Sequence, residues 1–376
     1  MKIAVNTRLL LPDKLEGIGW VAYETLMRIT RDHPEHEFFF IFDRKWDDRF
    51  IFSDNITPVA VPPQARHPLL YYLWFEWSIP HILKKVKADL FLSPDAYLSL
   101  RTNVKSIAVF HDLNFEHYPK DLPFLERKYY RYYFPRYAHK AQRIVTVSEF
   151  SKKDIVNIYD VPPEKISVVY NGANEGFIPI DEESRTLTQK VLTGGHPYFI
   201  FVGALHPRKN LARLFQAFDY FKEMHKSDIR LLVVGNRKYW TKDIQKAFDN
   251  MRHQQDVVFS GRMSAEKLHK AVGSALAMTY VSYFEGFGIP IIEAYRCDTP
   301  VVTSNVTSMP EVAGDAAVLV NPFSVKSIAS GLAKVAFDPE LRQTLIRKGR
   351  ERKEMFTWQK AAGNLWNVIE KELNHK

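Results

Sequence analysis

Short apolar segments and amphipathic helical segments alternate along the 376 residues, and this rhythm constrains the fold more than any other feature. The first repeat contains an apolar strand at 2–5, a helical pattern at 20–31 and a second strand at 37–42. A strand, a helix and a strand in this order form a βαβ unit, whose two strands lie parallel in one sheet. We therefore predict an α/β fold with parallel sheets.

The alternation occurs in two series, and the chain exceeds the roughly 100 to 200 residues of one domain, so we predict two Rossmann-like domains. The polar stretch after Gly172, with two glycines and a proline near its end, is interpreted as the connection. We place an N-terminal domain at 1–175 and a C-terminal domain at 176–357, and expect an amphipathic helix at 358–376 to return to the first. The remaining predicted strands are 90–93, 106–111, 143–148 and 166–170 in the first series, and 198–202, 229–234, 257–260, 275–280, 300–303 and 317–320 in the second.

Charge and cysteine content limit the kinds of partner. A net charge of +9 favours nucleic acids, anionic lipids or phosphorylated small molecules. Zinc-finger, helix-turn-helix and aromatic RNA-binding motifs are absent, so we expect no nucleic-acid partner. The single cysteine, Cys297, excludes an internal disulfide framework, as is typical of a reducing cytoplasm. The N-terminal apolar stretch is too short for a signal peptide or a membrane span, so we expect a cytoplasmic location.

A turn rich in cations follows the first strand of the second series. It reads GALHPRKN from Gly203, and a helical pattern comes directly after it. Gly203 allows a tight turn, Arg208 offers a planar fork for phosphate oxygens, and Lys209 adds a compact charge beside it. The pattern predicts a diphosphate site that needs no magnesium. A solvated basic turn is the alternative.

A glycine-rich turn with two glutamates follows the strand at 275–280. It reads YFEGFGIPIIEA, and Glu285 and Glu293 lie eight positions apart, with a helix predicted to start near Pro290. This spacing puts Glu285 in the loop and Glu293 inside the helix, so local geometry does not make them a close carboxylate pair. Each glutamate is predicted to hold a different part of one elongated ligand. The alternative is a structural turn with a buried helix carboxylate.

Two features of the first domain lie where ligands of parallel sheets bind. Gly17 and Gly19 precede a helical pattern, and glycines there let backbone N–H groups approach an anion. The fingerprint G-x-G-x-x-G is absent, so a dinucleotide site is not expected and a plain turn is the alternative. His111 ends the strand at 106–111, at the carboxyl edge where open α/β sheets bind ligands. A histidine satisfied by its neighbours is the alternative there.

Together these motifs resemble glycosyltransferase family 4, the group 1 glycosyltransferases, over nearly the whole chain. The resemblance implies the GT-B fold, in which two Rossmann-like domains face a central cleft. It also implies transfer of a sugar from a nucleotide diphosphate with retention of anomeric configuration, no dedicated metal ligand and no cofactor beyond the nucleotide-sugar co-substrate. The matching segments are the GIG loop, VFHD, VSEFSKKDI, VVYNG, FVGALHPRKN, SGR, EGFGIPIIEA and PVVTSNVTSMPEVAGDAAVLVNP.

The resemblance also implies roles for these residues. Glu285 matches the contact to the hydroxyls of the transferred sugar, and Glu293 matches the contact to the ribose. Arg208 and Lys209 match the diphosphate-binding cations, and His111 matches the residue near the reacting carbon. The implied catalytic residues are thus Glu285, His111, Arg208 and Lys209. The other implied donor-binding positions are Gly17, Gly19, Gly203, Phe287, Gly288 and Ile289.

The donor and the acceptor are less constrained than the reaction. Likeness to bacterial-type mannosyltransferases around HDL and PRKN favours GDP-mannose, and a UDP-linked hexose is the alternative. A nucleotide-sugar epimerase of the same fold and a non-catalytic glycan- or lipid-binding module are further alternatives. An epimerase would change the sugar without any acceptor.

Two aromatic and basic stretches, which start at His67 and at Glu126, are the clues to the acceptor. Cations beside aromatic rings suit an anionic membrane interface or a lipid-diphosphate acceptor. Aromatic side chains that pack on the sheet are the alternative, and Pro135 is expected to interrupt the second helix. We expect a saccharide or lipid-linked saccharide acceptor, and a cytoplasmic protein that is peripheral at the inner face of the cell membrane if the second stretch faces outward.

Overall fold

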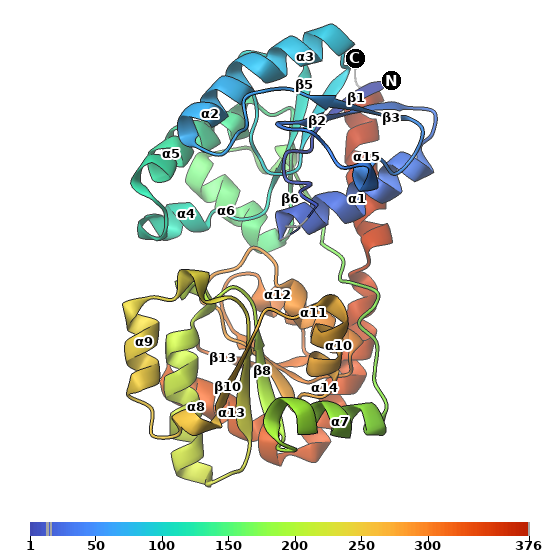
Figure 1. The fold of residues 1–376 in the computed structure, drawn as a ribbon. Coiled ribbons are helices and arrows are strands. Elements are labelled where there is room, and N and C mark those ends of the chain that lie inside the picture. The colour runs from blue at the N-terminus through green and yellow to red at the C-terminus, as the bar shows by residue number, and fades with distance from the viewer. Residues whose placement is uncertain (13–14, 16, 375–376) are drawn as a thin grey trace. The chain divides into compact units, whose positions relative to one another are not determined.

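The computed structural model describes residues 1–12, 15 and 17–374, which form two compact units. Unit 1 contains Met1–Gly172 and the C-terminal segment from Thr357, and unit 2 contains Ala173–Phe356. Each unit is a parallel sheet with helices on both faces (Figure 1). The prediction of two Rossmann-like domains is therefore confirmed.

The sheet of unit 1 has seven parallel strands within the described residues, in the order β3-β2-β1-β4-β5-β6-β7. β3 has no counterpart among the predicted strands. It contains Pro58, which breaks the hydrogen-bonding pattern of a strand, but an edge strand tolerates a proline that a central strand would exclude. The strands are β1 (Lys2–Asn6), β2 (Glu37–Phe42), β3 (Ile56–Ala60), β4 (Leu90–Ser93), β5 (Lys105–Phe110), β6 (Arg143–Thr146) and β7 (Ile166–Val168).

Helices cover both faces of this sheet. Figure 1 shows α1 and α15 on one side and α2, α3, α5 and α6 on the other. Trp366 of α15 stacks on His33 with ring centroids 3.7 Å apart, which joins the C-terminal helix to the end of α1. Of the helix predicted at 358–376, residues 375 and 376 lie outside the described part. The helices are α1 (Ile18–Asp32), α2 (Pro68–Leu73), the π-helical turn η2 (Trp74–Ser78), α3 (Ile79–Val86), α4 (Asn114–His117), α5 (Phe124–Lys140), α6 (Glu149–Tyr159) and α15 (Trp358–Asn374).

The expectation that Pro135 interrupts its helix is wrong, because α5 continues through it to Lys140. A proline inside a helix costs about 3 kcal/mol through the lost hydrogen bond and the ring clash. Tyr129, Phe134 and Tyr137 of the same helix are buried in the core of unit 1. Burial of a large side chain contributes about 1.5 to 3 kcal/mol, so the packing of these three rings offsets the cost.

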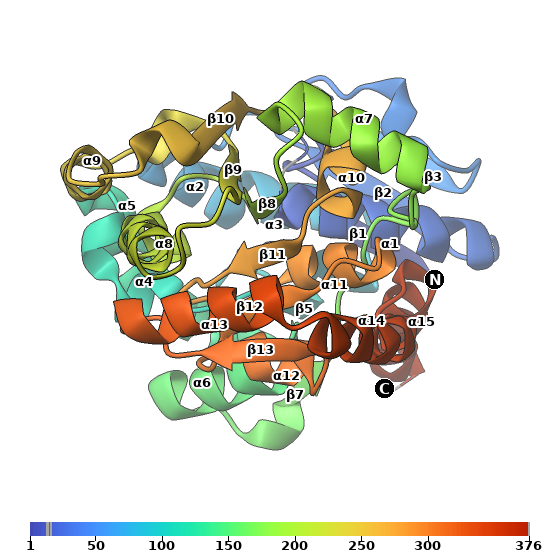
Figure 2. The same cartoon turned by 90° about the horizontal axis from the view of Figure 1, so that it is seen from below.

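The sheet of unit 2 has six parallel strands in the described chain, in the order β10-β9-β8-β11-β12-β13. Figures 1 and 2 show α8 and α13 on one side of it and α7, α10 and α11 on the other. The strands are β8 (Tyr198–Val202), β9 (Arg230–Val234), β10 (Val257–Gly261), β11 (Ala277–Tyr280), β12 (Val301–Ser304) and β13 (Ala317–Val320). The helices are α7 (Glu182–Thr193), α8 (Leu211–His225), α9 (Lys242–Asp249), α10 (Ala265–Gly273), α11 (Ile289–Arg296), α12 (Met309–Ala313), α13 (Val325–Phe337) and α14 (Pro339–Arg352).

The polar stretch interpreted as a connection contains a helix, α7. The carboxylate of Asp181 accepts a hydrogen bond of 2.7 Å from the N–H of Ser184, and Gly194 ends the helix in the left-handed conformation. Leu187 and Val191 are 62% and 74% exposed, so the helix has little apolar face. Its caps, rather than a hydrophobic stripe, are the sequence signal that identifies it.

Candidate functional site

Both sheets have a point at which the strand order reverses, and in open α/β sheets ligands bind there, at the carboxyl ends of the strands. In unit 2 the reversal falls between the adjacent strands β8 and β11. The GALHPRKN turn follows β8 and the EGFG loop follows β11, so the topology places the two motifs side by side.

Asn210 fixes the position of the turn after β8. The turn contains a single 3-10 turn, η5 (Pro207–Lys209), and Asn210 follows it with a φ of 64°. The Asn210 amide donates hydrogen bonds to the carbonyl oxygens of Val281 (3.0 Å) and Pro322 (2.7 Å). Gly203 has a φ of 149°, a backbone conformation that residues with a side chain rarely adopt, so the turn requires glycine at this position.

The EGFG loop is fixed by hydrogen bonds to both of its sides. The Ser308 hydroxyl lies 2.9 Å from the carbonyl oxygens of Glu285 and of Phe287. The N–H of Tyr283 donates to the carbonyl oxygen of Arg208 at 3.0 Å, which joins the two motifs through their backbones. The side chain of Glu285 is therefore held against the turn that carries the cations.

Arg208, Lys209 and Glu285 form one ionic cluster. Arg208 Nη1 lies 2.6 Å from Glu285 Oε2, and Lys209 Nζ lies 2.7 Å from Glu285 Oε1. Burial by itself raises the pKa of Glu285, but the attraction of Arg208 and Lys209 outweighs burial and lowers the pKa to about 2. Glu285 is thus ionised at neutral pH, and the cluster holds two positive charges against one negative charge.

Glu293 takes no part in this cluster and has a different electrostatic environment. It lies inside α11, which starts at Ile289 after Gly288 with a φ of 118°. Burial raises the pKa of Glu293 to about 7. The side chain of Phe287, just before α11, is buried, and that of Ile289 at its start is partly buried. At pH 7 Glu285 is therefore ionised, whereas Glu293 is near the midpoint of its titration.

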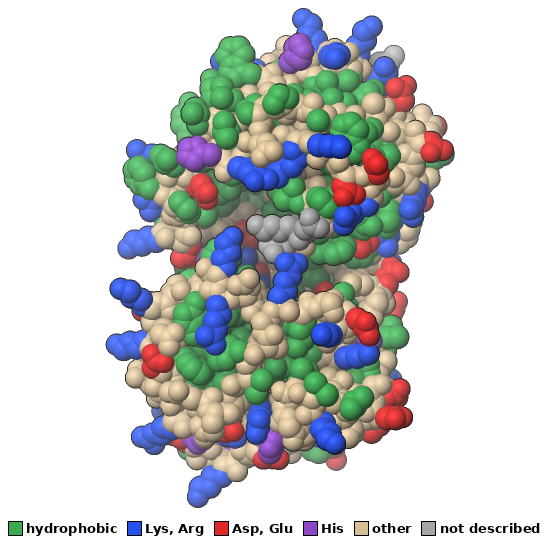
Figure 3. Space-filling model, in the orientation of Figure 1, with side chains coloured by type: hydrophobic (Ala, Val, Ile, Leu, Met, Phe, Trp, Pro, Cys, Tyr) green, Lys and Arg blue, Asp and Glu red, His purple; other side chains and the backbone are tan. Residues whose placement is uncertain are grey.

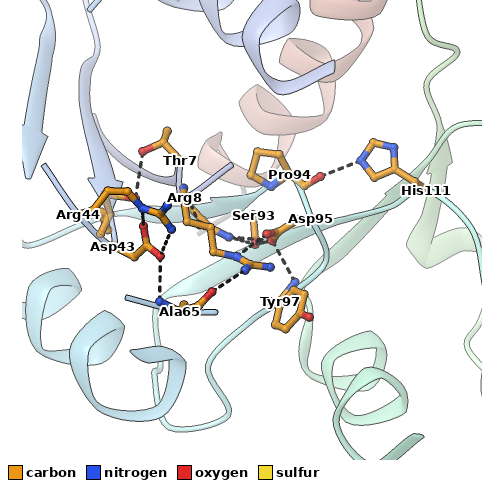
Figure 4. Close-up of polar contacts among 12 residues, drawn as sticks. Thr7, Arg8, Asp43, Arg44, Ala65, Ser93, Pro94, Asp95, Tyr97 and His111 are labelled. Carbon is orange, nitrogen blue, oxygen red and sulfur yellow. Dashed lines mark hydrogen bonds and ion pairs between the residues drawn. The ribbon is translucent and has the colours of Figure 1, made fainter. Parts of the chain in front are cut away.

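In unit 1 His111 directly follows β5 and donates to the chain after β4. Its Nε2 lies 2.8 Å from the carbonyl oxygen of Pro94 (Figure 4). Burial lowers the pKa of His111, which keeps the ring neutral at pH 7. A carbonyl only accepts, so Nε2 carries the proton and Nδ1 is the acceptor of the ring.

Sequence reasoning missed a buried ion pair at the reversal point of unit 1, between β1 and β4. Arg8 Nε lies 2.7 Å from Asp95 Oδ2 (Figure 4). The amide of Asn6 donates to Asp95 Oδ1 at 2.7 Å. The Arg8 guanidinium also lies 4.3 Å from the ring centroid of Tyr97. The sequence feature that could have indicated this pair is that polar residues directly follow these two apolar strands.

The two glycines of the GIG loop have different surroundings. Gly17 precedes α1 with a φ of 45°, and a Cβ there would meet no atom of the described residues within 4 Å. Gly19 lies inside α1, where a Cβ would approach the carbonyl oxygen of Leu9 to 3.0 Å. Gly19 therefore allows close packing of the helix, whereas anion binding at Gly17 stays a prediction from the sequence.

Among the described residues no group of three or more His, Cys, Asp and Glu side chains is arranged to hold a metal ion. None of the helices in this part of the chain is long and apolar enough to cross a membrane.

Family comparisons agree with the fold and the motifs. Residues 184–352 match the family described as Glycosyl transferases group 1, and residues 16–176 match Glycosyltransferase Family 4. The O-antigen chain mannosyltransferase RfbU of Salmonella typhimurium is 30% identical over 288 residues, which is 76% of each protein. The O-antigen chain mannosyltransferase B of Escherichia coli is 28% identical over 303 residues, 78% of each. The chain belongs to glycosyltransferase family 4, and it is a glycosyltransferase.

Solved structures show the same fold at low sequence identity. Anabaena HepE in complex with UDP-glucose superposes with a TM-score of 0.77 at 15% identity, over 99% of this chain and all of the other. WaaG, a glycosyltransferase involved in lipopolysaccharide biosynthesis, has a TM-score of 0.74 at 17% identity over 98% of this chain and 99% of its own. The GT-B fold predicted from the motifs is confirmed.

Proposed function

We propose that this glycosyltransferase transfers mannose from GDP-mannose to a saccharide or lipid-linked saccharide acceptor, with retention of the anomeric configuration. The observation that carries the proposal is the cluster of Arg208, Lys209 and Glu285 at the reversal point of the unit 2 sheet. Two cations beside a carboxylate suit a donor in which a diphosphate adjoins sugar hydroxyls. The names of the two sequence relatives favour mannose as the transferred sugar.

In the proposed reaction the acceptor oxygen attacks the anomeric carbon from the face on which the diphosphate leaves. The bond from that carbon to the phosphate oxygen breaks, and this oxygen takes the acceptor's proton. Arg208 and Lys209 neutralise the charge that develops on the diphosphate, so no divalent cation is needed. Glu285 accepts hydrogen bonds from the sugar, and Glu293 accepts them from the ribose. Roles for His111, Gly17, Gly19, Gly203 and the Phe287–Ile289 backbone stay predictions from the family resemblance.

A panel of nucleotide sugars tests the donor. Purified protein is incubated with GDP-mannose, UDP-glucose, UDP-galactose and UDP-N-acetylglucosamine, with and without a mannose-containing acceptor glycan, and released nucleotide is measured. Release of GDP that depends on the acceptor is the expected result. Selective release of UDP would instead support a UDP-linked hexose, which the likeness of fold to HepE bound to UDP-glucose keeps as the second candidate. Inversion of the sugar with no acceptor present would identify an epimerase.

We further propose that the protein meets its acceptor at an anionic membrane surface. The helices α2, η2, α3 and α5 carry exposed apolar and cationic side chains, and Figure 3 shows green and blue side chains together over this part of unit 1. Glu76 of η2 is buried and Glu126 of α5 is partly buried, so these helices expose hardly any negative charge. We name this surface the basic aromatic face, and it consists of Leu69, Leu73, Trp77, Lys84, Lys85, Phe124, Lys128, Arg131, Tyr132 and Arg136.

A further inference from the structure

Tyr280 contacts the cationic turn from the core of unit 2. It is the last residue of β11, and only 1% of its surface is exposed. Lys209 Nζ donates a hydrogen bond of 2.6 Å to the Tyr280 hydroxyl, and it also lies 2.7 Å from Glu285 Oε1. The ammonium group is therefore held by an oxygen atom at the end of β11 and by another in the loop that follows β11.

A lysine needs such anchors if its charge is to act at one defined place. Its ammonium group ends a flexible four-carbon chain and has no planar fork to orient it, unlike the guanidinium of Arg208. Of its two anchors, Glu285 is also the residue proposed to bind the sugar hydroxyls, so a bound donor competes for that carboxylate. The hydroxyl of Tyr280 is not proposed to bind the donor, because its ring is enclosed in the core.

Tyr280 also leaves the charge of Lys209 available. Burial, together with the neighbouring Glu285 carboxylate, raises the pKa of Tyr280 well above its usual value, so the phenol stays neutral. A neutral acceptor orients an ammonium group without cancelling its charge, whereas a second carboxylate at this place would neutralise the cluster.

We propose that Tyr280 is a positioning residue, which holds Lys209 Nζ in place for the diphosphate of the donor. This inference rests on the proposed function, because it assigns the diphosphate to Lys209. Tyr280 touches no substrate in this proposal and acts only through the lysine.

The test compares two fully buried tyrosines whose hydroxyls each make a hydrogen bond of 2.6 Å. Tyr198 of β8 is also fully buried, and its hydroxyl donates to the carbonyl oxygen of Ala271 at 2.6 Å, within the core. Tyr280→Phe and Tyr198→Phe each remove one hydroxyl and keep the ring. We expect similar falls in the thermal midpoint of both variants. Only Tyr280→Phe is expected to weaken binding of GDP or UDP in calorimetry and to lower kcat/KM for the donor, by about 10- to 100-fold, the range of one hydrogen bond to a charged group.

A double variant separates positioning from a merely structural role. If Tyr280 acts through Lys209, then Tyr280→Phe changes the affinity for the nucleoside diphosphate no further once Lys209 is alanine. Equal affinities and kinetics of Tyr280→Phe and Tyr198→Phe, or independent losses in the double variant, overturn the inference. Failure of the parent protein to bind GDP and UDP would overturn the proposed function and this inference with it. Normal binding by the parent with no effect of Tyr280→Phe would overturn this inference alone.

Discussion

Lys209 and Glu285 lie far apart in the sequence, yet Nζ of the lysine is 2.7 Å from Oε1 of the glutamate. They meet because β8 and β11 are neighbours in the sheet although two strands separate them along the chain. Part of the positive charge proposed to bind the diphosphate is therefore balanced within the protein. This balance determines what the variants of either residue should do.

We expect Glu285→Gln to bind a nucleoside diphosphate more tightly than the parent while it loses most transfer. The amide removes the negative charge beside Arg208 and Lys209, so the attraction of this turn for a diphosphate increases. An increase in affinity of about 3- to 10-fold, equivalent to roughly 0.7 to 1.4 kcal/mol, is expected in calorimetry with GDP and UDP. Weaker binding than in the parent would mean that Glu285 is needed to build the phosphate site rather than to bind the sugar.

Lys209→Ala should lower kcat/KM for transfer by about 100- to 1000-fold, the usual effect of removing one group that stabilises a developing anion. The thermal midpoint is measured alongside, because the variant also removes the ion pair between Lys209 and the buried Glu285. Lys270→Ala is the control, since it breaks only the exposed 3.0 Å pair with Glu266 on α10. Turnover close to that of the control would remove Lys209 from the site.

Donor affinity should depend on the ionisation of Glu293, whose pKa burial raises to about 7. The ionised carboxylate accepts hydrogen bonds from ribose hydroxyls and the protonated form accepts them less well, so KM for the donor should fall as pH rises from 6 to 8. Glu293→Gln should raise KM and abolish this dependence. An identical pH profile in the parent and the variant would contradict the assignment.

The same pKa has a consequence for stability, with a definite sign. The folded pKa of Glu293 lies above the ordinary value of 4.5, so the folded state binds the proton more tightly than the unfolded state. The resulting stabilisation is present below pH 4.5 and is lost as pH rises through 7. Thermal unfolding is measured without donor at pH 5 and at pH 8. The thermal midpoint of Glu293→Gln, relative to that of the parent at the same pH, should therefore be higher at pH 8 than at pH 5.

The sequence predicted the position of the cations and of Glu285 because each follows an apolar strand and lies in a glycine-containing turn. It could not predict their contact, because alternation along the chain does not reveal the strand order across a sheet. The same reason explains the missed pair of Arg8 and Asp95, which follow β1 and β4 and meet at the reversal point of the other sheet. Tyr280 carried no signal either, since an aromatic residue that ends a buried strand looks like any core residue.

The helices show the corresponding limit for local patterns. The C-terminal helix at 358–376 was predicted from an apolar stripe, but α7 depends on its caps at Asp181 and Gly194 and exposes its few apolar side chains. α5 contains Pro135, which disfavours a helix at this position, but the packing of Phe134 and its neighbours stabilises the helix there. An apolar stripe therefore identifies a helix that buries one face, whereas α7 needs its caps and α5 needs its tertiary contacts.

A chelator should leave transfer unchanged. In the proposed reaction Arg208 and Lys209 neutralise the negative charge of the leaving diphosphate, so no step needs a divalent cation. Activity is measured in EDTA and then with added magnesium or manganese, after dialysis against the chelator. Loss in EDTA with recovery on adding either metal would falsify the metal-independent proposal.

The basic aromatic face should bind vesicles that contain anionic lipid, and salt should weaken the binding. Each exposed Lys or Arg near such a surface contributes about 1 kcal/mol, and the attraction decays within the Debye length of about 10 Å at 0.1 M salt. The structure indicates which aromatic side chains of α5 can contact the lipid. Tyr129 and Tyr137 are buried, with their hydroxyls 2.7 Å apart, so Phe124 and Tyr132 are the exposed rings of the helix.

Charge-reversal variants at two places distinguish vesicle binding through the basic aromatic face from binding that depends only on the net positive charge of the protein. Lys128→Glu/Arg131→Glu changes the basic aromatic face, and Lys190→Glu/Lys226→Glu makes the same change in net charge on exposed positions of unit 2. Co-sedimentation with phosphatidylserine-containing vesicles at low salt should be lost in the first variant and kept in the second. Equal losses would show that only net charge matters. Negligible binding of the parent at both low and high salt would leave these side chains as ordinary surface of unit 1 and favour an acceptor that is reached in solution.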